Sequence, residues 1–347
     1  MPKKIKLLVV DDSMLFREML KKGMEDDEEI EVVGYATDPY MARDRIIELR
    51  PDVMTLDVNM PKMSGIEFLK RLLPQYPMPV VVVSGVDDSV FEALEAGAVE
   101  FVGKPSRKNK DAMQEMIEEL KYKIKISATA KIEKRKEERK PARKAIGNIK
   151  ETKIKDKKNS ANKIIAIGAS TGGTEAIFDV ISKFPEDIPG VVIVQHMPPV
   201  FTNMYAQRLN LSCPVTVAEA KDGDEITKGK VLIAPGDYQM EVVKKGSRFF
   251  VKCYKGEKVT GHCPSVDVLF HSVANLRGPD VIAVLLTGMG RDGANGMKRI
   301  SEADGVTIGQ DEQSCVVYGM PRAAYELGAV RYQLPLTDIS RKIVSLV

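Results

Sequence analysis

Residues 164–173 read IIAIGASTGG, an apolar run that passes directly into a turn of small residues. A helical pattern follows from Glu175 to Lys183, so this stretch predicts a buried strand, a sharp turn and a helix. Small residues on both sides of Ser170 allow such a turn to push its hydroxyl outward, as in the G-x-S-x-G pattern. The stretch therefore predicts both an α/β fold and a candidate nucleophile.

The same alternation of strands and helices continues to the end of the chain. Further strands are expected at residues 191–194, 231–234 and 281–286, and a hairpin at Glu241–Val243 and Phe249–Lys252 with Gly246 in its turn. Uninterrupted apolar strands that alternate with helices are typical of parallel sheets covered on both faces. We therefore expect residues 161–347 to form a doubly wound, mostly parallel α/β hydrolase domain that carries a β-hairpin.

A second α/β unit is expected before this one, in residues 1–124. Its short apolar runs lie at residues 5–10, 30–35, 53–56, 80–83 and 100–102, with amphipathic stretches such as 42–49 and 65–73 between them. Many of these runs are rich in β-branched residues. The pattern predicts a sheet of five parallel strands with helices on both faces.

A basic segment separates the two units. Residues 121–160 hold sixteen Lys and Arg against five Asp and Glu, although the whole chain has a net charge of only +3. High charge with little apolar surface predicts a linker, which we place at residues 125–160. Binding of nucleic acid or acidic lipid is the alternative for such a run. Solvated linkers are commonly charged, so we expect no nucleic-acid partner.

Composition limits the compartment and excludes a membrane protein. No apolar stretch reaches the length of a membrane span, and the first residues, 1–6, lack a signal-peptide layout. The four cysteines form no C-x-x-C pair, so reduced core thiols are expected rather than disulfides or zinc ligands. These features predict a cytoplasmic protein without direct membrane insertion.

Polar side chains follow the predicted strands of the first unit. They are Asp11, Asp12, Asp57, Ser84 and Lys104. Ligand chemistry in open α/β sheets gathers at the carboxyl ends of strands, and three converging carboxylates need a hard cation such as magnesium. A carboxylate beside that metal can attack a phosphoryl group, whose oxygens a hydroxyl and an ammonium can bind. The alternative is that these residues are merely solvated loop residues, which fits any one of them better than all five.

These segments resemble a known family. VVDDS (9–13), LDVNMPKMSG (56–65), VVSG (82–85) and FVGKP (101–105) are similar to the receiver domains of two-component response regulators, which have a flavodoxin-like fold. The resemblance implies that a histidine kinase phosphorylates Asp57, and that Ser84 and Phe101 occupy switch positions. The implied magnesium ligands are Asp11, Asp12, Asp57 and the backbone carbonyl oxygen of Asn59.

The strand ends of the second unit bring a different set of groups. Ser170, His196 and Asp292 each follow a predicted strand, so a hydroxyl, an imidazole and a carboxylate arrive at one edge of the sheet. These are the parts of a Ser–His–Asp relay, in which the base activates the hydroxyl and the acid orients the base. The backbone N–H of Thr171 at a helix start, and that of Met289 between glycines, are candidate oxyanion donors.

Other interpretations of this edge remain open. A glycine-rich turn can cradle a phosphate, but the turn at Ser170 does not match G-x-G-x-x-G, and GK[ST] is absent from the chain. His196 could be a buried structural histidine, although His262, in a loop, and His271, in a helix expected at 266–276, are less well placed as bases. No histidine follows Asp292, so the Ser-Asp-His order of lipase-type hydrolases would require His271 to pair with Asp224 or Asp237, which disfavours that class.

The second unit also resembles a known family. The matching segments are IGASTGG, VQHMPPVFT, LIAPGDYQM, HCPSVDVLF, LLTGMGRDGANGM and QDEQSCVVYGMP, and they are similar to the catalytic domain of CheB-type chemotaxis protein-glutamate methylesterases over residues 162–346. The resemblance implies Ser170 as nucleophile, His196 as base, Asp292 as orienting acid and Met289 N–H as an oxyanion donor. The family's PGD-x-H element ends here in Gln239, from which we draw no catalytic inference.

Taken together, the two resemblances imply a regulated enzyme. The substrates would be glutamate methyl esters on methyl-accepting chemotaxis receptors, hydrolysed with release of methanol, and selected glutamines would be deamidated. The receiver would need Mg²⁺ and a kinase as phosphodonor, whereas the esterase would need no cofactor. Phosphorylation would relieve blockage of the active-site edge by the receiver. The rival hypotheses are a transcriptional regulator, which the α/β pattern after residue 162 disfavours, and a catalytically silent adaptor.

Overall fold

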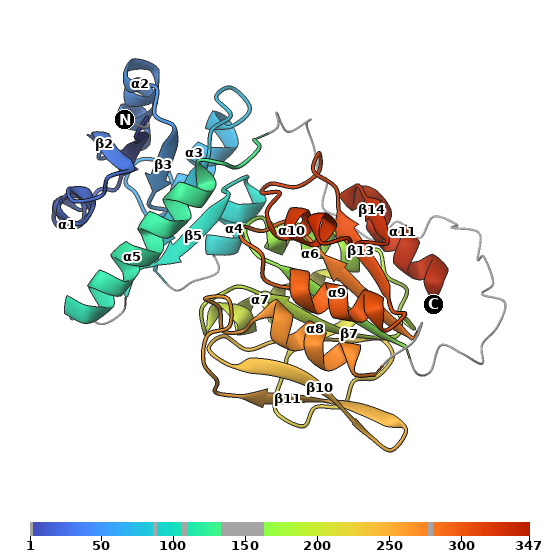
Figure 1. The fold of residues 1–347 in the computed structure, drawn as a ribbon. Coiled ribbons are helices and arrows are strands. Elements are labelled where there is room, and N and C mark those ends of the chain that lie inside the picture. Colours follow the sequence, from blue (N-terminus) through green and yellow to red (C-terminus); the bar gives the residue numbers. More distant parts are fainter. Residues whose placement is uncertain (1–2, 86–88, 106–109, 133–162, 277–279) are drawn as a thin grey trace.

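The computed structural model describes residues 3–85, 89–105, 110–132, 163–276 and 280–347, which form two α/β units (Figure 1). Of the predicted linker, residues 133–160 lie outside the described residues. The last helix of the first unit ends at Ser127, and the boundaries at 124 and 160 stay predictions. Over the described residues, no helix is long and apolar enough to cross a membrane.

The first unit is the predicted five-stranded parallel sheet, and its strands lie in the order β2-β1-β3-β4-β5. Its elements are β1 (Ile5–Val10), α1 (Met14–Met24), β2 (Ile30–Ala36), α2 (Pro39–Leu49), β3 (Val53–Leu56), α3 (Gly65–Leu72), β4 (Val80–Ser84), α4 (Ser89–Glu95), β5 (Glu100–Gly103) and α5 (Lys110–Ser127). Alternate residues of each strand face opposite layers of helices, so Leu7 packs with Leu120 of α5 on one face while Leu8 packs with Ile46 of α2 on the other. This arrangement explains the uninterrupted apolar strands.

The second unit is a seven-stranded parallel sheet in the order β14-β13-β12-β6-β7-β9-β8, with a separate antiparallel hairpin. Its elements are β6 (Ile164–Ala169), α6 (Gly173–Ile181), β7 (Gly190–Gln195), α7 (Phe201–Ser212), β8 (Thr216–Glu219), β9 (Lys230–Ile233), β10 (Gln239–Lys245), β11 (Arg248–Tyr254), α8 (Val266–Ala274), β12 (Val281–Leu285), α9 (Ala294–Glu302), β13 (Val306–Gln310), α10 (Met320–Glu326), β14 (Tyr332–Leu334) and α11 (Leu336–Leu346). The predicted fold class and the hairpin are confirmed.

Three strands of this sheet were not predicted from the sequence. β8 and β14 are short edge strands whose residues are mostly half-buried, so they lack a long apolar run. β13 reads VTIGQ and is wholly buried, but threonine, glycine and glutamine interrupt its apolar pattern. The pairs β12–β6 and β6–β7, which position the polar strand ends, consist of predicted strands, although the missed β13 pairs with the other edge of β12.

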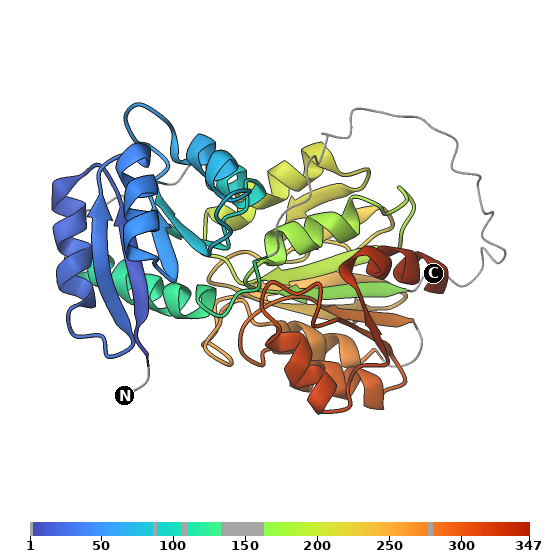
Figure 2. The same ribbon diagram turned by 90° about the horizontal axis from the view of Figure 1, so that it is seen from above.

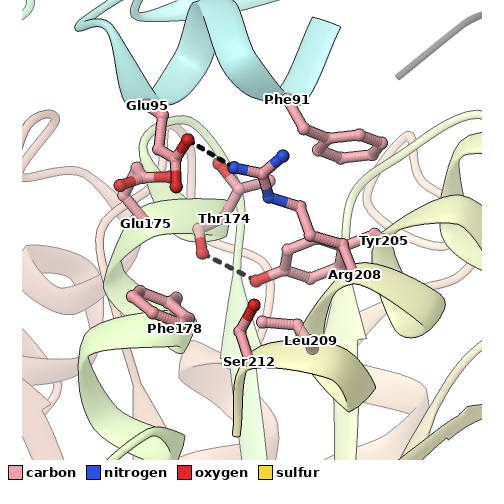
Figure 3. Close-up of a pocket in the computed structure, with 9 residues that line it drawn as sticks. All are labelled: Phe91, Glu95, Thr174, Glu175, Phe178, Tyr205, Arg208, Leu209 and Ser212. Atoms are coloured by element: carbon pink, nitrogen blue, oxygen red, sulfur yellow. Dashed lines mark hydrogen bonds and ion pairs between the residues drawn. The ribbon is translucent and has the colours of Figure 1, made fainter. Parts of the chain in front are cut away.

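The two units contact each other through the α4–β5 side of the first unit (Figure 2). Phe91 of α4 stacks on Tyr205 of α7, and Phe101 of β5 packs against Phe201, the first residue of α7, with ring centroids 4.7 Å apart. Figure 3 shows the edge of this contact, where Glu95 forms an ion pair with Arg208 at 2.6 Å. The buried aromatic rings belong to one continuous apolar cluster that spans both units.

Candidate active site

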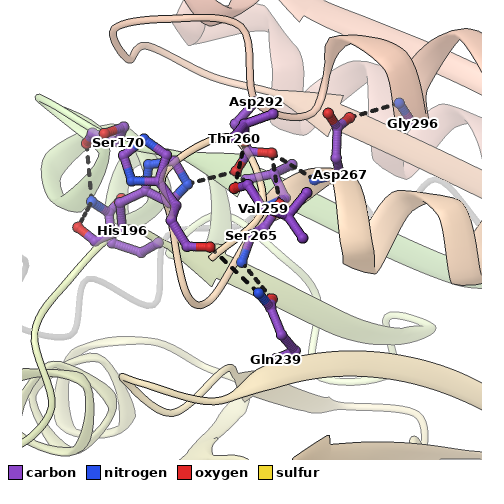
Figure 4. A network of polar contacts seen from close by, with 12 residues as sticks. Ser170, His196, Gln239, Val259, Thr260, Ser265, Asp267, Asp292 and Gly296 are labelled. Atoms are coloured by element: carbon purple, nitrogen blue, oxygen red, sulfur yellow. Dashed lines mark hydrogen bonds and ion pairs between the residues drawn. The ribbon is translucent and has the colours of Figure 1, made fainter. Parts of the chain in front are cut away.

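Adjacent parallel strands bring the predicted relay to one edge of the second sheet. Ser170 directly follows β6 and His196 directly follows β7, its neighbour, while Asp292 lies in the loop between β12 and α9. Strand β12 pairs with β6 on the side opposite β7, so all three loops open at the same sheet edge. Figure 4 shows Ser170, His196 and Asp292 side by side.

His196 is held by a buried carboxylate. Its Nε2 lies 2.8 Å from Oδ2 of Asp292, whose side chain is 1% exposed. Asp292 also accepts hydrogen bonds from the hydroxyl of Ser265 at 2.8 Å and from the amides of Val266 and Asp267 at 2.7 and 3.0 Å. Burial alone would raise the pKa of Asp292, but its bond to His196, the histidine charge and these donors hold the pKa well below its usual range.

The bond to Asp292 decides which ring nitrogen of His196 is available as a base. A carboxylate only accepts hydrogen bonds, so the proton of the neutral imidazole lies on Nε2 and the lone pair on Nδ1. Nδ1 is buried and has no hydrogen-bond partner in the described part of the chain. Figure 4 shows Ser170, which carries the neighbouring hydroxyl, next to His196. The arrangement suits transfer of a proton from Ser170 to Nδ1 of His196.

A set of hydrogen bonds fixes the turn that carries Ser170. The Ser170 amide donates to the carbonyl of Thr287 at 3.0 Å, and the hydroxyl of Thr287 donates to the carbonyl of Thr171 at 3.0 Å. The carboxamide of Gln195 donates to the carbonyls of both Ser170 and His196, at 3.0 and 3.2 Å. Gly172 has a φ of 74°, and a Cβ there would lie 2.7 Å from Val316. The turn therefore requires this glycine.

Two backbone amides flank the candidate nucleophile. Thr171 is buried at the start of α6, and the loop of Met289 packs closely enough that a Cβ on Gly288 would lie 2.7 Å from Cβ of Ser170. Within the described residues, neither the Thr171 nor the Met289 amide donates to a protein acceptor. Both predicted oxyanion donors therefore lie beside Ser170, and their role in catalysis stays a prediction.

His262, which the sequence placed in a loop away from the strand ends, lies at this site. Its imidazole stacks on that of His196 with centroids 3.7 Å apart and planes at 12°. The pKa of His262 is lowered to about 4, mainly by burial and to a smaller extent by the nearby His196. Its segment HCPSVDVLF was one of the six that resemble the methylesterase family, which was the signal available in the sequence.

Gln239 positions the loop that carries His262. Its carboxamide nitrogen donates to the carbonyls of Glu257 and His262 at 2.9 and 3.4 Å, while its oxygen accepts from the amide of Ser265 at 2.9 Å (Figure 4). The side chain is 2% exposed. The residue at which the sequence departs from the family's PGD-x-H element therefore has a positioning contact with the loop.

The alternative base, His271, lies on α8 and is half-buried. Burial lowers the pKa of His271, and the carboxylates that oppose this shift are Asp267 and Asp292 rather than Asp224 or Asp237. Among the described residues no hydrogen bond or ion pair joins His271 to either of those two aspartates. The pairing required for a lipase-type order is therefore not formed.

The polar strand ends of the first unit also meet. Carboxylate oxygens of Asp11, Asp12 and Asp57 lie within 4.8 Å of one another. The ammonium of Lys104 lies 2.7 Å from Asp11 and 2.6 Å from Asp57. Burial raises the pKa of Asp57, and Lys104 only partly opposes this rise. Burial would lower the pKa of Lys104, but its contacts with Asp11 and Asp57 outweigh that effect and raise it.

This donor set fits a hard divalent cation, because three carboxylates converge where a single ammonium balances two of them. The hydroxyl of Ser84 is fully buried without a hydrogen-bond partner among the described residues, as suits a group that awaits phosphoryl oxygens. Asn59 donates its amide to Asp57 at 3.2 Å. Phe101 is 3% exposed and lies in the contact between the two units.

Comparison with known proteins matches both units. The CheB methylesterase family model matches residues 165–343, and the response regulator receiver domain model matches residues 7–125. The protein-glutamate methylesterase/protein-glutamine glutaminase 2 of Syntrophomonas wolfei is 52% identical, with 99% of this chain and 98% of the relative covered. The corresponding Syntrophotalea carbinolica protein is 50% identical, with 100% and 98% covered. The crystal structure of the Thermotoga maritima CheB methylesterase catalytic domain is 39% identical, with a TM-score of 0.53, and covers 54% of this chain and 100% of that domain.

Proposed function

The chain belongs to the CheB methylesterase family, and we propose that it hydrolyses glutamate methyl esters and deamidates glutamines on chemotaxis receptors under control of its receiver domain. The observation that carries the proposal is the bond between His196 and Asp292 beside Ser170, at the ends of adjacent strands. Two close relatives that span the whole chain are named for both activities.

In the first step, Ser170 Oγ attacks the ester carbonyl carbon and its proton moves to Nδ1 of His196. The resulting imidazolium is stabilised by Asp292, which stays ionised. The carbonyl oxygen becomes an oxyanion, which the amides of Thr171 and Met289 stabilise. Loss of one such donor typically costs about 10²–10³-fold in kcat.

In the second step, the tetrahedral intermediate collapses. The bond to the methoxy oxygen breaks, and methanol leaves with the proton that His196 had taken. Water then attacks the acyl-enzyme, His196 removes a proton from this water and returns it to Ser170, and the glutamate carboxylate is released. Deamidation follows the same path with ammonia as the leaving group. Because nitrogen must be protonated before it can leave, this reaction depends more strongly on the proton that His196 returns.

The receiver unit supplies control. Asp57 accepts a phosphoryl group from a histidine kinase, and Lys104 and Ser84 bind its oxygens. Asp11, Asp12, Asp57 and the carbonyl of Asn59 would hold Mg²⁺, which neutralises charge on the transferring phosphoryl group. The esterase step involves no cofactor in this proposal, and the enzyme acts in the cytoplasm on the signalling regions of receptors.

The contact between the units supports a route for that control. Phe101, at the predicted switch position, packs on Phe201, which lies five residues after His196 in the chain. A change in the packing of Phe101 on phosphorylation would shift the population of docked units and open the sheet edge. This contact favours a phosphorylation-gated enzyme over a silent adaptor.

The test is methanol release from methylated receptor membranes, with and without a small phosphodonor. We expect release that rises with the phosphodonor and is abolished in Ser170→Ala, while phosphorylation of Asp57 in that variant is unchanged. Release by Ser170→Ala at the wild-type rate would show that the nucleophile is another group. Absence of release by the wild type, with Ser170 unreactive towards serine reagents, would favour the adaptor.

A further inference from the structure

The hairpin β10–β11 has one face against the body of the second unit and one face outward (Figure 1). Met240, Val242 and Val251 are buried, and the amide of Val242 donates to the hydroxyl of Ser272 on α8 at 2.8 Å. The side chains that alternate with them point to the other face, where the cations are exposed and Phe250 is half-buried. The outward face is therefore a sheet surface with a partly exposed aromatic ring at its centre.

Cations are arranged over the rings of this outward face. Lys245 and Arg248, which pair across the strands, lie 5.4 and 5.5 Å from the centroid of Phe250. Lys252 lies 4.8 Å from the ring of Tyr254. Arg248 and Lys252 remain 66% and 55% exposed, so contact with the rings orders their stems while their charged groups stay accessible. We call Lys245, Arg248 and Lys252 the basic face.

Positive charge is concentrated here within the second unit. Residues 239–258 contain six Lys and Arg against two Asp and Glu, whereas the rest of residues 163–347 contains fourteen against eighteen. Two carboxylates offset part of this charge, since Glu225 lies 3.5 Å from Arg248 and Glu241 lies 3.9 Å from Lys252, whereas Lys245 forms no ion pair with another described residue. The hairpin is therefore a local basic surface on an otherwise acidic unit.

The hairpin that carries the basic face is connected to the active site at its other end, at Gln239 and Tyr254. Strand β11 leads into a loop that ends at His262, which stacks on the base, His196. Gln239, the first residue of the hairpin, binds the carbonyl of His262 at 3.4 Å. Lys255 lies over the ring of Tyr238 at 5.9 Å, and Lys258 lies in the loop itself. Basic residues therefore lie at both ends of the hairpin segment, with Lys258 near His262 and Lys245 and Arg248 at the turn.

We propose that the basic face docks an acidic surface of the substrate protein while one of its glutamyl groups is hydrolysed at the active site. This rests on the proposed function, which makes the substrate a protein that carries several glutamyl side chains. Every ester hydrolysed and every glutamine deamidated leaves a carboxylate, so the substrate surface becomes more anionic as the reaction proceeds. A positive surface on the same unit as the site complements it, increasing encounter rates and retaining substrates with several sites.

The test compares receptor with a small ester. The variants are Lys245→Glu/Arg248→Glu/Lys252→Glu and the milder Lys245→Gln/Arg248→Gln/Lys252→Gln. We expect about a tenfold loss of kcat/KM on methylated receptor membranes for the first variant, mainly through KM, with a flatter dependence on salt. Hydrolysis of p-nitrophenyl acetate should be unchanged. The matched control is Lys342→Glu, which removes a similar cation at 3.8 Å from the ring of Tyr332 on another part of the unit.

Binding in a Ser170→Ala background separates the two proposals, because sedimentation with receptor membranes needs no catalysis. Weaker sedimentation of the hairpin variants, but not of the Lys342 control, supports docking even if methanol release fails. Equal sedimentation and equal kcat/KM of all variants would overturn docking and leave the proposed function intact. Equally strong, hairpin-dependent binding to receptor-free vesicles of phosphatidylethanolamine and phosphatidylglycerol, or to DNA, would also overturn it.

Discussion

The imidazole of His262 lies face to face with that of His196, with ring centroids 3.7 Å apart. His196 is thus restrained by Asp292 at Nε2 and by a flat ring across one face, while its Nδ1 has no hydrogen-bond partner among the described residues. A ring restrained in this way can return a proton along the direction from which it received it. In the proposed mechanism, His262 would therefore position His196 for both proton transfers.

His262→Ala should lower kcat by about 10–100-fold, with a larger loss for deamidation than for demethylation. An amine leaving group needs the proton from His196 more than methanol does, so a loosened ring affects the amide reaction more. His262→Phe keeps a flat ring over His196 and should restore most of both activities. The measurement is release of ammonia and of methanol from the same receptor preparation. Equal losses in both reactions, with no rescue by phenylalanine, would contradict a positioning role.

The fold should lose stability as His262 is forced to protonate. The pKa of His262 is about 4 in the fold against 6.5 for an ordinary histidine, so between these values the unfolded chain binds more protons than the folded one. Stability therefore rises with pH across this window, is complete above about 6.5, and is lost as pH falls through it, by up to about 3 kcal/mol. Urea unfolding at pH 4.5 and 7 should show a smaller difference for His262→Phe than for the wild type. An equal difference would mean that other groups cause the loss.

Asp292→Asn should reduce kcat by about 10⁴-fold with little change in secondary structure. An amide at this position can present its NH₂ group to Nε2, which stabilises the tautomer with the proton on Nδ1 and removes the lone pair that accepts the Ser170 proton. The control is Asp304→Asn, at a surface turn after α9. Methanol release by the Asp292 variant within tenfold of the wild type would exclude Asp292 as the orienting acid.

The ion pair between Glu95 and Arg208 gives a test of how the units dock, because it joins the receiver to α7 at 2.6 Å. Arg208→Glu places like charges together and should raise activity without phosphodonor by about 2–5-fold, since an exposed pair contributes little more than about 1 kcal/mol. The double exchange Glu95→Arg/Arg208→Glu should return this activity towards the wild-type level. If the single variant leaves activity without phosphodonor unchanged, docking through this surface does not restrict the site.

The Ser170–His196–Asp292 relay was predictable because each of its residues follows a strand that can be recognised from its own stretch of sequence. A strand that ends in Ser170 and a strand that ends in His196 are recognisable one at a time, and parallel pairing then brings their ends together. The same logic brought Asp11, Asp57 and Lys104 into contact. The fold class is confirmed, whereas the catalytic roles of the site residues stay predictions.

His262 was not predictable in the same way, because its place depends on contacts between distant segments. The loop that carries it has no regular structure, and the carboxamide of Gln239, twenty-three residues away, holds its backbone. Edge strands such as β14 were missed for a related reason, since their residues are only partly buried and leave no periodic apolar pattern. Local patterns predict what a segment forms, but not which loop covers which side chain.

The single carboxamide of Gln239 connects the hairpin to the loop over the base, so these two features cannot be exchanged independently between related enzymes. A chimera that replaces only the tips of β10 and β11 would keep the native loop, whereas one that replaces the first residue of the hairpin would release it. Transplanting substrate preference therefore requires the whole segment 239–265 as one module. In evolutionary terms, residue 239 and the loop 257–265 are expected to vary together.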